Sequence, residues 1–260
     1  MKVYSTDKNG ETSFTMPFRS YLKGVNHRGY NTIAPENTLP AYILSAKNGF
    51  RFVETDISFT SDNVPVLLHD ATINRTSNGS GSINSMTFAQ VRQYDFGSWK
   101  SSSYAGTKIP SLEEFLVLCR NLGLHPYLEI KNDYEYSQAQ LKKIVDMVEG
   151  YGMKGSVSYI SFSSEYLAII KTLDEYARLG FVCYGHEGDV ETALSLKTGK
   201  NEVFLDSGSG GIQQCKDAGL PFERWTIDDK ATIVSLDNYV SGVTSNIINA
   251  EFVKYEKSLG

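Results

Sequence analysis

The sequence has few cysteines and no long hydrophobic run, and each shortage narrows the possible functions. Its three cysteines, Cys119, Cys183 and Cys215, show neither metal-ligand spacing nor a disulfide framework, so we expect buried structural thiols. No window approaches the about 18 apolar residues of a membrane span. The polar, charge-interrupted stretch from Met1 to Lys23 has no apolar signal segment, so a cytoplasmic location is expected. A catalytic fragment of a secreted or membrane-anchored protein would look the same.

An excess of positive charge is also absent. The 260 residues include 25 basic and 30 acidic side chains, which gives a formal net charge of −5 at pH 7. Nucleic-acid binding needs a basic surface that releases counterions, so this balance argues against a nucleic-acid partner. A small phosphate-containing substrate is compatible with it, because a bound cation reverses the local charge. Loops rich in Ser, Gly and Asn argue against stable membrane insertion, and the oligomeric state is left open.

What the sequence does contain is a regular alternation of short apolar runs and amphipathic segments. Eight runs have strand character: Lys23–His27, Phe52–Phe59, His125–Ile130, Ser156–Ile160, Leu179–Tyr184, Glu202–Asp206, Phe222–Ile227 and Gly242–Ile247. Helical patterns lie between most of them: Leu39–Asn48, Leu112–Asn121, Gln138–Glu149, Glu165–Leu173, Gly211–Ala218 and Lys230–Leu236. This alternation predicts an α/β protein, a (β/α)8 TIM barrel, more readily than a doubly wound open sheet, which usually has fewer strands.

Residues 61–109 interrupt the alternation. They begin with a short extra strand, Val64–Leu68, and are then rich in Ser, Gly, Asn and Thr. We interpret this segment as a small insertion after the second barrel strand, within one domain that spans residues 1–260. Its aromatic side chains either line one wall of a pocket or pack the insertion onto the barrel: Tyr94, Phe96, Trp99 and Tyr104.

Acidic residues lie in or at the end of two of the predicted barrel strands. Glu54 and Asp56 leave the same strand face, where two buried acids repel unless they are protonated or bound to a cation. Glu129 would complete a set of carboxylates that suits Mg²⁺, Ca²⁺ or Mn²⁺. Zinc fits less well, because zinc sites usually use Cys or His ligands and no such set is present. The simpler alternative is a solvated strand face. Active sites of such barrels lie where the carboxyl ends of neighbouring strands converge.

Two of the four histidines, His27 and His69, lie at the ends of apolar runs beside charged residues. Hydrolysis of a phosphodiester needs one group to activate the attacking oxygen and another to protonate the leaving alcohol. The alternative for a single histidine is a structural hydrogen bond, and we expect packing or surface roles for the other two. Arg28 would hold a phosphate oxygen and Lys131 would neutralise developing charge, unless each simply pairs with a nearby acid.

Taken in order, these motifs resemble the glycerophosphodiester phosphodiesterase family, which has a phospholipase C-like barrel. The specific motifs are His27-Arg28-Gly29, Ala34-Pro35-Glu36-Asn37-Thr38, Glu54-Thr55-Asp56, Leu68-His69-Asp70 and Leu128-Glu129-Ile130-Lys131. Looser matches are Thr72 through Arg75-Thr76 and Gly79, Pro110-Ser111-Leu112-Glu113-Glu114, Trp225-Thr226 and Gly242-Val243-Thr244-Ser245. The resemblance runs from about Val25 to Asn246.

The resemblance implies a TIM barrel with a small insertion after strand 2. It also implies metal-dependent hydrolysis of glycerophosphodiesters to sn-glycerol 3-phosphate and an alcohol, for which attack by the substrate's own glycerol hydroxyl through a cyclic phosphate is one mechanism considered. One divalent cation would be held by Glu54, Asp56 and Glu129. The family often has an acid near the end of the last strand, where this chain has Ser245 and Asn246, and this departure bears on substrate preference.

By the same resemblance, His27 and His69 form the general acid–base pair. Arg28 and Lys131 would contact the phosphate, and Trp225 would line the glycerol or alcohol side of the pocket. Two alternatives stay open. One is a lipid phosphodiesterase similar to phospholipase D or to phosphatidylinositol-specific phospholipase C. The other is a non-catalytic barrel that binds phosphorylated ligands.

Overall fold

The computed structural model describes residues 5–6, 12–13, 22–132 and 135–246 of the chain. Eight parallel strands form a ring in the order β3-β11-β10-β9-β8-β7-β6-β4, which the pairing of β3 with β4 closes. The ring strands are β3 (Lys23–Asn26), β4 (Phe52–Phe59), β6 (His125–Ile130), β7 (Ser158–Ser161), β8 (Arg178–Cys183), β9 (Glu202–Ser207), β10 (Phe222–Arg224) and β11 (Val240–Ser245). The predicted TIM barrel is therefore confirmed. Apart from it, β1 (Ser5–Thr6) and β2 (Thr12–Ser13) form a short antiparallel pair.

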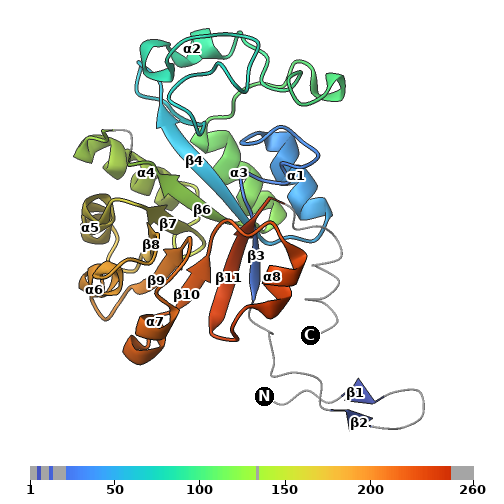
Figure 1. The fold of residues 1–260 in the computed structure, drawn as a ribbon. Coiled ribbons are helices and arrows are strands. Elements are labelled where there is room, and N and C mark those ends of the chain that lie inside the picture. The colour runs from blue at the N-terminus through green and yellow to red at the C-terminus, as the bar shows by residue number, and fades with distance from the viewer. Residues whose placement is uncertain (1–4, 7–11, 14–21, 133–134, 247–260) are drawn as a thin grey trace.

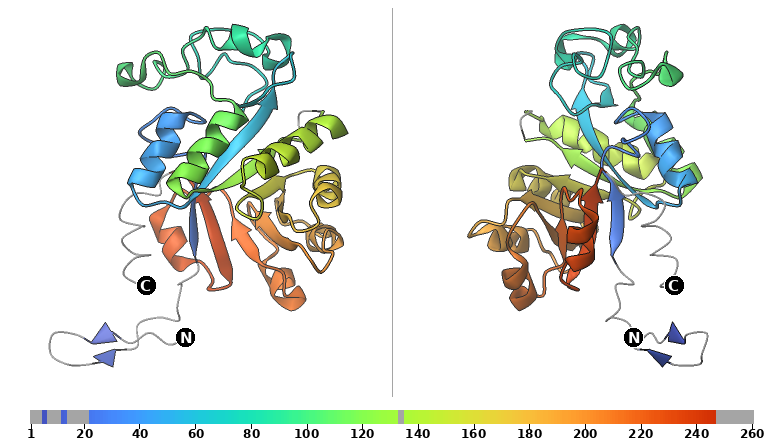
Figure 2. Two further views of the ribbon diagram at one scale, coloured as in Figure 1. Left: turned by 180° about the vertical axis from the view of Figure 1, so that it is seen from behind. Right: turned by 45° about the vertical axis from the view of Figure 1, so that its right-hand side comes forward.

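Helices cover the outside of the ring (Figures 1 and 2). They are α1 (Leu39–Lys47), α3 (Leu112–Leu122), α4 (Gln138–Gly150), α5 (Ser164–Leu173), α6 (Asp189–Ser195), α7 (Ile212–Ala218) and α8 (Lys230–Ser235). The insertion holds the short helix α2 (Phe88–Val91) and the 3₁₀ turns η1 (Ile83–Ser85) and η2 (Ser102–Tyr104). Six of the helices match predicted segments to within two residues at each end. Helix α6 was not predicted, because it buries only Val190 and Ala193 and has too few apolar residues to show a helical period.

Local sequence signals set the ends of the predicted helices. At the start of α3, the Ser111 hydroxyl accepts a hydrogen bond from the Glu114 N–H (3.2 Å), and the Glu114 carboxylate accepts one from the Ser111 N–H (2.9 Å). This is the capping box expected from the spacing. The same helix ends at Gly123 in the left-handed conformation (φ 66°), which glycine adopts without steric cost.

Several barrel strands end earlier than the sequence suggested. β3 ends at Asn26, so His27 follows the strand, although its N–H still donates to the Ser245 carbonyl (3.1 Å). β10 likewise ends just before Trp225. β11 was predicted as Gly242–Ile247 but is Val240–Ser245, and Ile247 lies outside the described residues. His27 and Trp225 thus lie just beyond the ends of their strands, at the mouth of the barrel.

The insertion, residues 61–109, lies over the carboxyl end of β4 (Figures 1 and 2). It begins with β5 (Pro65–Leu67), which pairs antiparallel with β4. Its buried apolar side chains form a separate cluster: Val66, Leu68, Ile73, Ile83, Val91, Phe96 and Ile109. Tyr94 packs against this cluster, and Trp99 donates its indole N–H to the Phe96 carbonyl (3.0 Å). These contacts support the packing alternative for the insertion's aromatic residues.

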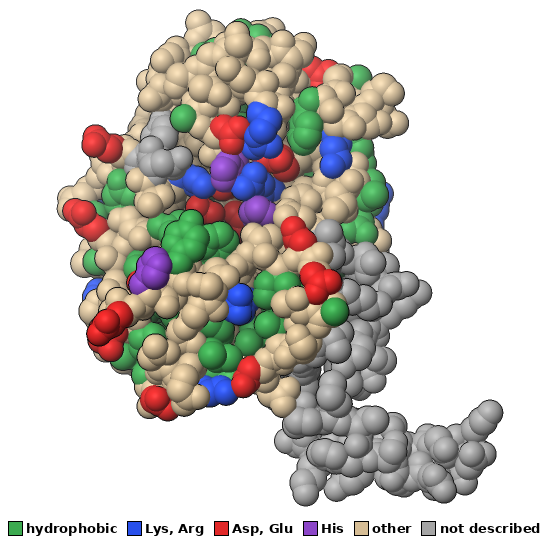
Figure 3. Space-filling view, in the orientation of Figure 1, with side chains coloured by type: hydrophobic (Ala, Val, Ile, Leu, Met, Phe, Trp, Pro, Cys, Tyr) green, Lys and Arg blue, Asp and Glu red, His purple; other side chains and the backbone are tan. Residues whose placement is uncertain are grey.

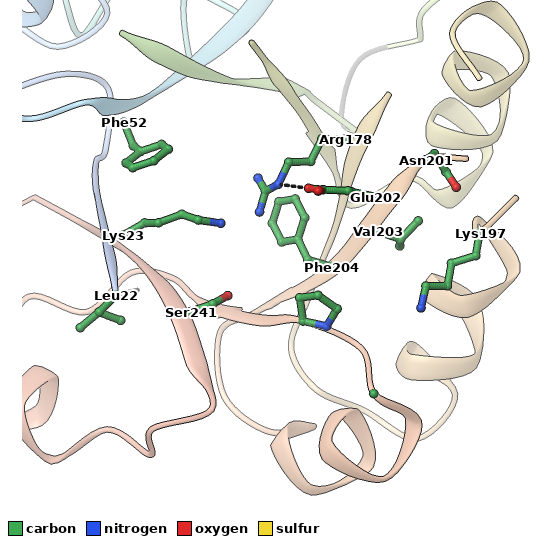
Figure 4. Close-up of a pocket in the computed structure, with 12 residues that line it drawn as sticks. Leu22, Lys23, Phe52, Arg178, Lys197, Asn201, Glu202, Val203, Phe204 and Ser241 are labelled. Atoms are coloured by element: carbon green, nitrogen blue, oxygen red, sulfur yellow. Dashed lines mark ion pairs between the residues drawn. The ribbon is translucent and has the colours of Figure 1, made fainter. Parts of the chain in front are cut away.

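The amino-terminal end of the barrel holds a charged network of its own. The buried Glu223 carboxylate pairs with Arg178 (2.7 Å) and Lys23 (3.1 Å). Burial alone would raise the pKa of Glu223, but these two cations hold it below its ordinary value. A cavity of about 720 Å³ opens at this end, and Arg178 also pairs there with Glu202 at 3.2 Å (Figure 4). An apolar layer inside the barrel, which includes Tyr127, separates this network from the opposite end.

The three cysteines are buried free thiols, as expected. Among the described residues, no helix is long and apolar enough to cross a bilayer.

Candidate active site

The register of two neighbouring strands brings three carboxylates together at the carboxyl end of the barrel. Glu54 and Asp56 are two residues apart in β4 and therefore share the face that points into the barrel. Asp56 is paired with Glu129 across the parallel ladder between β4 and β6. One oxygen from each of the three lies within 4.8 Å of the others, and all three side chains are buried. The alternative of a solvated strand face is thus excluded here, and the three carboxylates form a shared acidic site.

Burial and mutual repulsion dominate the electrostatics of this site. Burial, then the neighbouring Asp56, raise the pKa of Glu54 well above its ordinary value. The same two causes raise the pKa of Glu129 to about 7, against the opposing effect of Lys131. Burial opposes ionisation of Asp56 as well, but Arg28 (3.3 Å) and Lys131 (3.5 Å) hold its pKa below the ordinary value. Two of the three acids therefore resist ionisation unless further positive charge is present.

The donor set fits a divalent cation. Glu54 Oε1 is buried and, among the described residues, has no hydrogen-bond partner. Asp56 Oδ1 and Glu129 Oε1 are buried too and face the Lys131 ammonium at 3.5 and 3.2 Å. Three carboxylates next to the two cationic side chains of Arg28 and Lys131 leave one negative charge uncompensated. Hard oxygen ligands and an excess of negative charge are what Mg²⁺ and Ca²⁺ sites require.

Arg28 connects the acidic site to its surroundings through both its backbone and its side chain. Its backbone is left-handed (φ 57°), which is uncommon for a residue with a Cβ and occurs often at functional sites. This conformation directs its N–H to Glu54 Oε2 (2.9 Å). Its guanidinium donates to Glu36 (2.9 Å) and faces Asp56, which also accepts a hydrogen bond from Asn37 Nδ2 (2.8 Å).

His69 enters the site from the insertion, directly after Leu68. Its Nδ1 lies 2.7 Å from Asp70 Oδ1, and Arg75 donates to the same carboxylate (2.8 Å) and to Glu36 (2.8 Å). The Arg75 hydrogen bonds hold the pKa of Asp70 down to about 2. An ionised Asp70 accepts the Nδ1 proton of His69, so Nε2 is the nitrogen left to exchange a proton with a substrate.

His27 is held by an amide in place of an acid. Its Nδ1 lies 2.8 Å from Asn246 Oδ1, and Asn246 Nδ2 donates to Asp228 Oδ2 (2.7 Å). Because the Asn246 NH₂ group faces a carboxylate, its oxygen faces His27, and Nδ1 of the neutral ring carries the proton. Burial, then the neighbouring Arg28, lower the pKa of His27. Nε2, 3.9 Å from Glu54 Oε2, is therefore the proton-accepting nitrogen.

The structure brings all eight sequence-predicted site residues to one place. A cavity of about 340 Å³ is lined by seven of them, and the eighth, Asp56, lies beneath in contact with Arg28 and Lys131; the seven are His27, Arg28, Glu54, His69, Glu129, Lys131 and Trp225. Figure 3 shows histidine, basic and acidic side chains gathered in this hollow below the insertion, with hydrophobic side chains beside them.

Comparison with known proteins identifies the family of this barrel with two oriented histidines beside three buried carboxylates. The model of the glycerophosphoryl diester phosphodiesterase family matches residues 27–249. The chain belongs to this family. The match covers the barrel except β3, and it includes every residue placed in the site above.

The chain is similar to several named members of the family. It is 40% identical over 128 residues to glycerophosphodiester phosphodiesterase 1 of Mus musculus, a match that covers 48% of this chain and 39% of the mouse protein. It is 26% identical over 208 residues to a glycerophosphodiester phosphodiesterase of Caldanaerobacter subterraneus subsp. tengcongensis, covering 79% of this chain and 86% of that protein. The crystal structure of a glycerophosphodiester phosphodiesterase from Agrobacterium tumefaciens superposes with a TM-score of 0.70 at 26% identity, covering 86% and 96% of the two chains. The chain thus spans about two fifths of the mouse protein.

Sequence reasoning assigned no role to several residues that support the site. Glu36, Asn37 and Arg75 lay within family motifs, so their presence was noted but their contacts were not. Asn246 was noted only as a departure from the family pattern. Asp206, which lines the cavity, gave no signal at all, because it ends an otherwise ordinary strand pattern.

Of the two roles considered for the insertion's aromatic residues, the pocket wall is not found. None of the insertion's aromatic residues lines the cavity, whereas Phe162, Tyr184 and Trp225 do. The other two histidines have the packing and surface roles expected for them. His125 bonds to the Ser158 hydroxyl (2.9 Å) towards the amino end of the barrel, and His186 is exposed.

Proposed function

We propose that this protein hydrolyses glycerophosphodiesters to sn-glycerol 3-phosphate and an alcohol, and that the reaction depends on a divalent cation. The observation that carries the proposal is the single cavity in which three buried carboxylates lie beside two histidines with fixed tautomers. That arrangement occurs in a chain of the glycerophosphoryl diester phosphodiesterase family. Its bacterial relative is named a glycerophosphodiester phosphodiesterase.

Glu54, Asp56 and Glu129 would hold the cation, with Mg²⁺ or Ca²⁺ preferred and Mn²⁺ compatible. When bound, such an ion polarises a phosphoryl oxygen and offsets negative charge in the transition state. With the ion's two positive charges, the site carries a net positive charge and suits a phosphodiester anion. The Arg28 guanidinium and the Lys131 ammonium would bind the non-bridging phosphate oxygens from the same side.

The two histidines would divide the proton transfers. His27, neutral with Nε2 unprotonated, would accept the proton of the attacking oxygen, while Asn246 keeps the ring oriented. His69, oriented by Asp70, would deliver a proton to the oxygen of the leaving alcohol. Trp225 lines the cavity and would contact the organic part of the substrate.

The test is release of sn-glycerol 3-phosphate from glycerophosphocholine and glycerophosphoethanolamine, with EDTA and after Mg²⁺ or Ca²⁺ is added back. We expect metal-restored turnover, and a loss of about 100-fold or more in His27→Ala and in His69→Ala. His125→Ala is the matched control, because this histidine lies outside the cavity. No turnover by folded, metal-saturated protein would overturn the proposal.

We also propose that the chain forms one domain in which residues 61–109 are an insertion, and that its partner is this small-molecule substrate. The absence of a nucleic-acid partner, the absence of stable membrane insertion and the cytoplasmic location stay predictions from composition. Size-exclusion chromatography with and without nuclease treatment would detect a bound nucleic acid. Fractionation of cells would test the location and the absence of membrane insertion.

A further inference from the structure

Three aromatic rings stand together on one wall of the active-site cavity. Phe162, Tyr184 and Trp225 each directly follow a barrel strand, namely β7, β8 and β10. The Trp225 ring lies 5.3 Å from Phe162 and 5.4 Å from Tyr184, both edge-to-face, and the Phe162 and Tyr184 rings are 5.8 Å apart. Tyr184 is 54% exposed, so this wall is open to a molecule that enters the cavity.

The orientation of Trp225 is fixed from below. Its indole N–H donates to the backbone carbonyls of Asp206 (3.0 Å) and Cys183 (3.2 Å). A Cβ at Gly208 would lie 3.3 Å from Trp225 Cζ2 and 3.4 Å from Tyr184 Cδ1, so glycine at this position lets the two rings and the backbone approach closely. The wall is therefore preorganised rather than a loose group of side chains.

A buried carboxylate lies between the strands that carry these rings. Asp206 belongs to β9, is 2% exposed and lines the same cavity. Its Oδ1 has no hydrogen-bond partner in the part of the chain that the structure describes. The nearby guanidinium groups are engaged elsewhere, because Arg224 donates to the carbonyls of Ser207 and Gly208 and Arg178 pairs with Glu223.

Burial, then the neighbouring Glu223 and Glu129, raise the pKa of Asp206, so this carboxyl group ionises only when a cation pairs with it. Its unpaired Oδ1 at the cavity wall therefore points to a ligand group as its partner. A cationic group can interact both with the aromatic rings and with the Asp206 carboxyl group. Aromatic faces attract ammonium groups, and a carboxylate beside them adds direct charge compensation. In the ring of eight strands, β9 is four places from β4, so Asp206 lies across the barrel from Glu54 and Asp56. A phosphate held at the acidic site would place one of its two alcohols against this wall.

We propose that Phe162, Tyr184, Trp225 and Asp206 form a subsite for a leaving alcohol that carries an ammonium group, and that the protein prefers such diesters. This proposal rests on the proposed phosphodiesterase function. A trimethylammonium group, as in choline, cannot donate a hydrogen bond and would depend mainly on the rings. A primary ammonium group, as in ethanolamine, would donate to Asp206 Oδ1 directly.

The first test compares kcat/KM for glycerophosphocholine, glycerophosphoethanolamine and the uncharged-alcohol diester glycerophosphoglycerol, in metal-saturated protein. We expect both cationic diesters to exceed glycerophosphoglycerol by about tenfold. We call the kcat/KM of each cationic diester divided by that of glycerophosphoglycerol its selectivity ratio. Asp206→Asn should lower both ratios to within about threefold of one, with the larger loss for glycerophosphoethanolamine. Tyr184→Leu should lower the choline ratio, whereas Tyr184→Phe, which keeps the ring, should retain it.

Two results would overturn this subsite. One is equal kcat/KM for all three diesters in the unaltered protein, and the other is an Asp206→Asn variant with unchanged ratios. If Asp206→Asn does not fold, the exposed Tyr184 pair of variants still decides whether the rings select a cation. Turnover of none of the diesters would instead refute the phosphodiesterase function itself, so the two failures are distinguishable.

A binding measurement gives a second readout that does not depend on turnover. The chain has two tryptophans, so Trp99→Phe leaves Trp225 as the only indole fluorophore. We expect choline to change this emission with a dissociation constant about tenfold lower than that of 3,3-dimethylbutan-1-ol, its uncharged analogue of the same shape. Equal binding of the two alcohols would show apolar contact alone and would contradict recognition of charge.

Discussion

Metal-linked stability offers a test of the acidic site that is independent of catalysis. An ion that binds only the folded chain stabilises it by about 2.7 kcal/mol at a concentration 100 times its dissociation constant. For a protein of this size, that free energy raises the melting temperature by about 5–10 °C. The unaltered protein should therefore melt about 5–10 °C higher in Ca²⁺ or Mg²⁺ than in EDTA, as measured by circular dichroism.

Glu54→Gln should remove most of this rise, because it deletes one of three carboxylates whose oxygens lie within 4.8 Å of one another. The glutamine oxygen can still accept the hydrogen bond from the Arg28 N–H, so the local fold is retained. In EDTA we expect the variant to be more stable than the unaltered protein by about 1 kcal/mol or more. Burial and the neighbouring Asp56 raise the pKa of Glu54, so this carboxyl group destabilises the folded protein at neutral pH, and an amide removes that cost.

The matched control is Glu149→Gln, the same chemical change at an exposed carboxylate paired with Lys154. A surface pair of this kind contributes little, so both its stability in EDTA and its metal-induced rise should equal those of the unaltered protein. A Glu54→Gln variant that keeps the full rise would refute ligation by Glu54. A variant that loses stability in EDTA would refute the repulsion argument.

Four further predictions concern residues around the acidic site and away from it. Asp70→Asn should lower kcat/KM at least about tenfold by releasing the His69 ring, with the metal-induced rise in melting temperature unchanged; normal kinetics would contradict the orienting role. Arg178→Met should cost about 3–5 kcal/mol in urea unfolding, since it leaves the Glu223 carboxylate without its nearest cation, and an unchanged midpoint would show that the pair is not needed. The pKa of Glu223 is lower in the folded protein than its unfolded value of about 4.5. Its contribution to stability is therefore present above pH 4.5 and is lost as the pH falls through the folded pKa. Glu223→Gln should accordingly flatten the acid side of the curve of unfolding free energy against pH. Ser111→Ala should cost about 1 kcal/mol through loss of the capping box, as thermal unfolding would show.

The acidic site was predictable because its geometry follows from strand periodicity. Glu54 and Asp56 share a face at any register, and the apolar residues around them indicated a buried strand. Glu129 ends the next strand of the ring, and parallel strands in a barrel place their carboxyl ends together. The eight-strand alternation likewise required only local patterns, which is why the fold could be predicted before any contact was known.

Residues whose role depends on contacts between distant segments could not be predicted in the same way. Asp206 reaches the cavity only because of the register of β9 with β8 and β10, and no local pattern encodes that register. Asn246 acts on His27 across 219 positions of sequence. The aromatic wall comes from three separate strands, and the family resemblance placed only one of its members, Trp225, in the pocket. The insertion's aromatic residues were left with two possible roles, and Tyr94 and Phe96 pack in the insertion's own cluster.

The two halves of the proposed acid–base pair have different origins in the fold. His27 follows a barrel strand, but His69 and its partners Asp70 and Arg75 all belong to the insertion, which is joined to the barrel side through Glu36. In the proposed mechanism, the barrel carries the cation ligands and the phosphate-binding cations, and the insertion brings the proton donor. A change confined to His69, Asp70 or Arg75 would then leave the residues that hold a phosphodiester in place and remove the group that protonates the leaving alcohol. Binding and cleavage of the substrate can therefore separate through substitutions in the insertion alone.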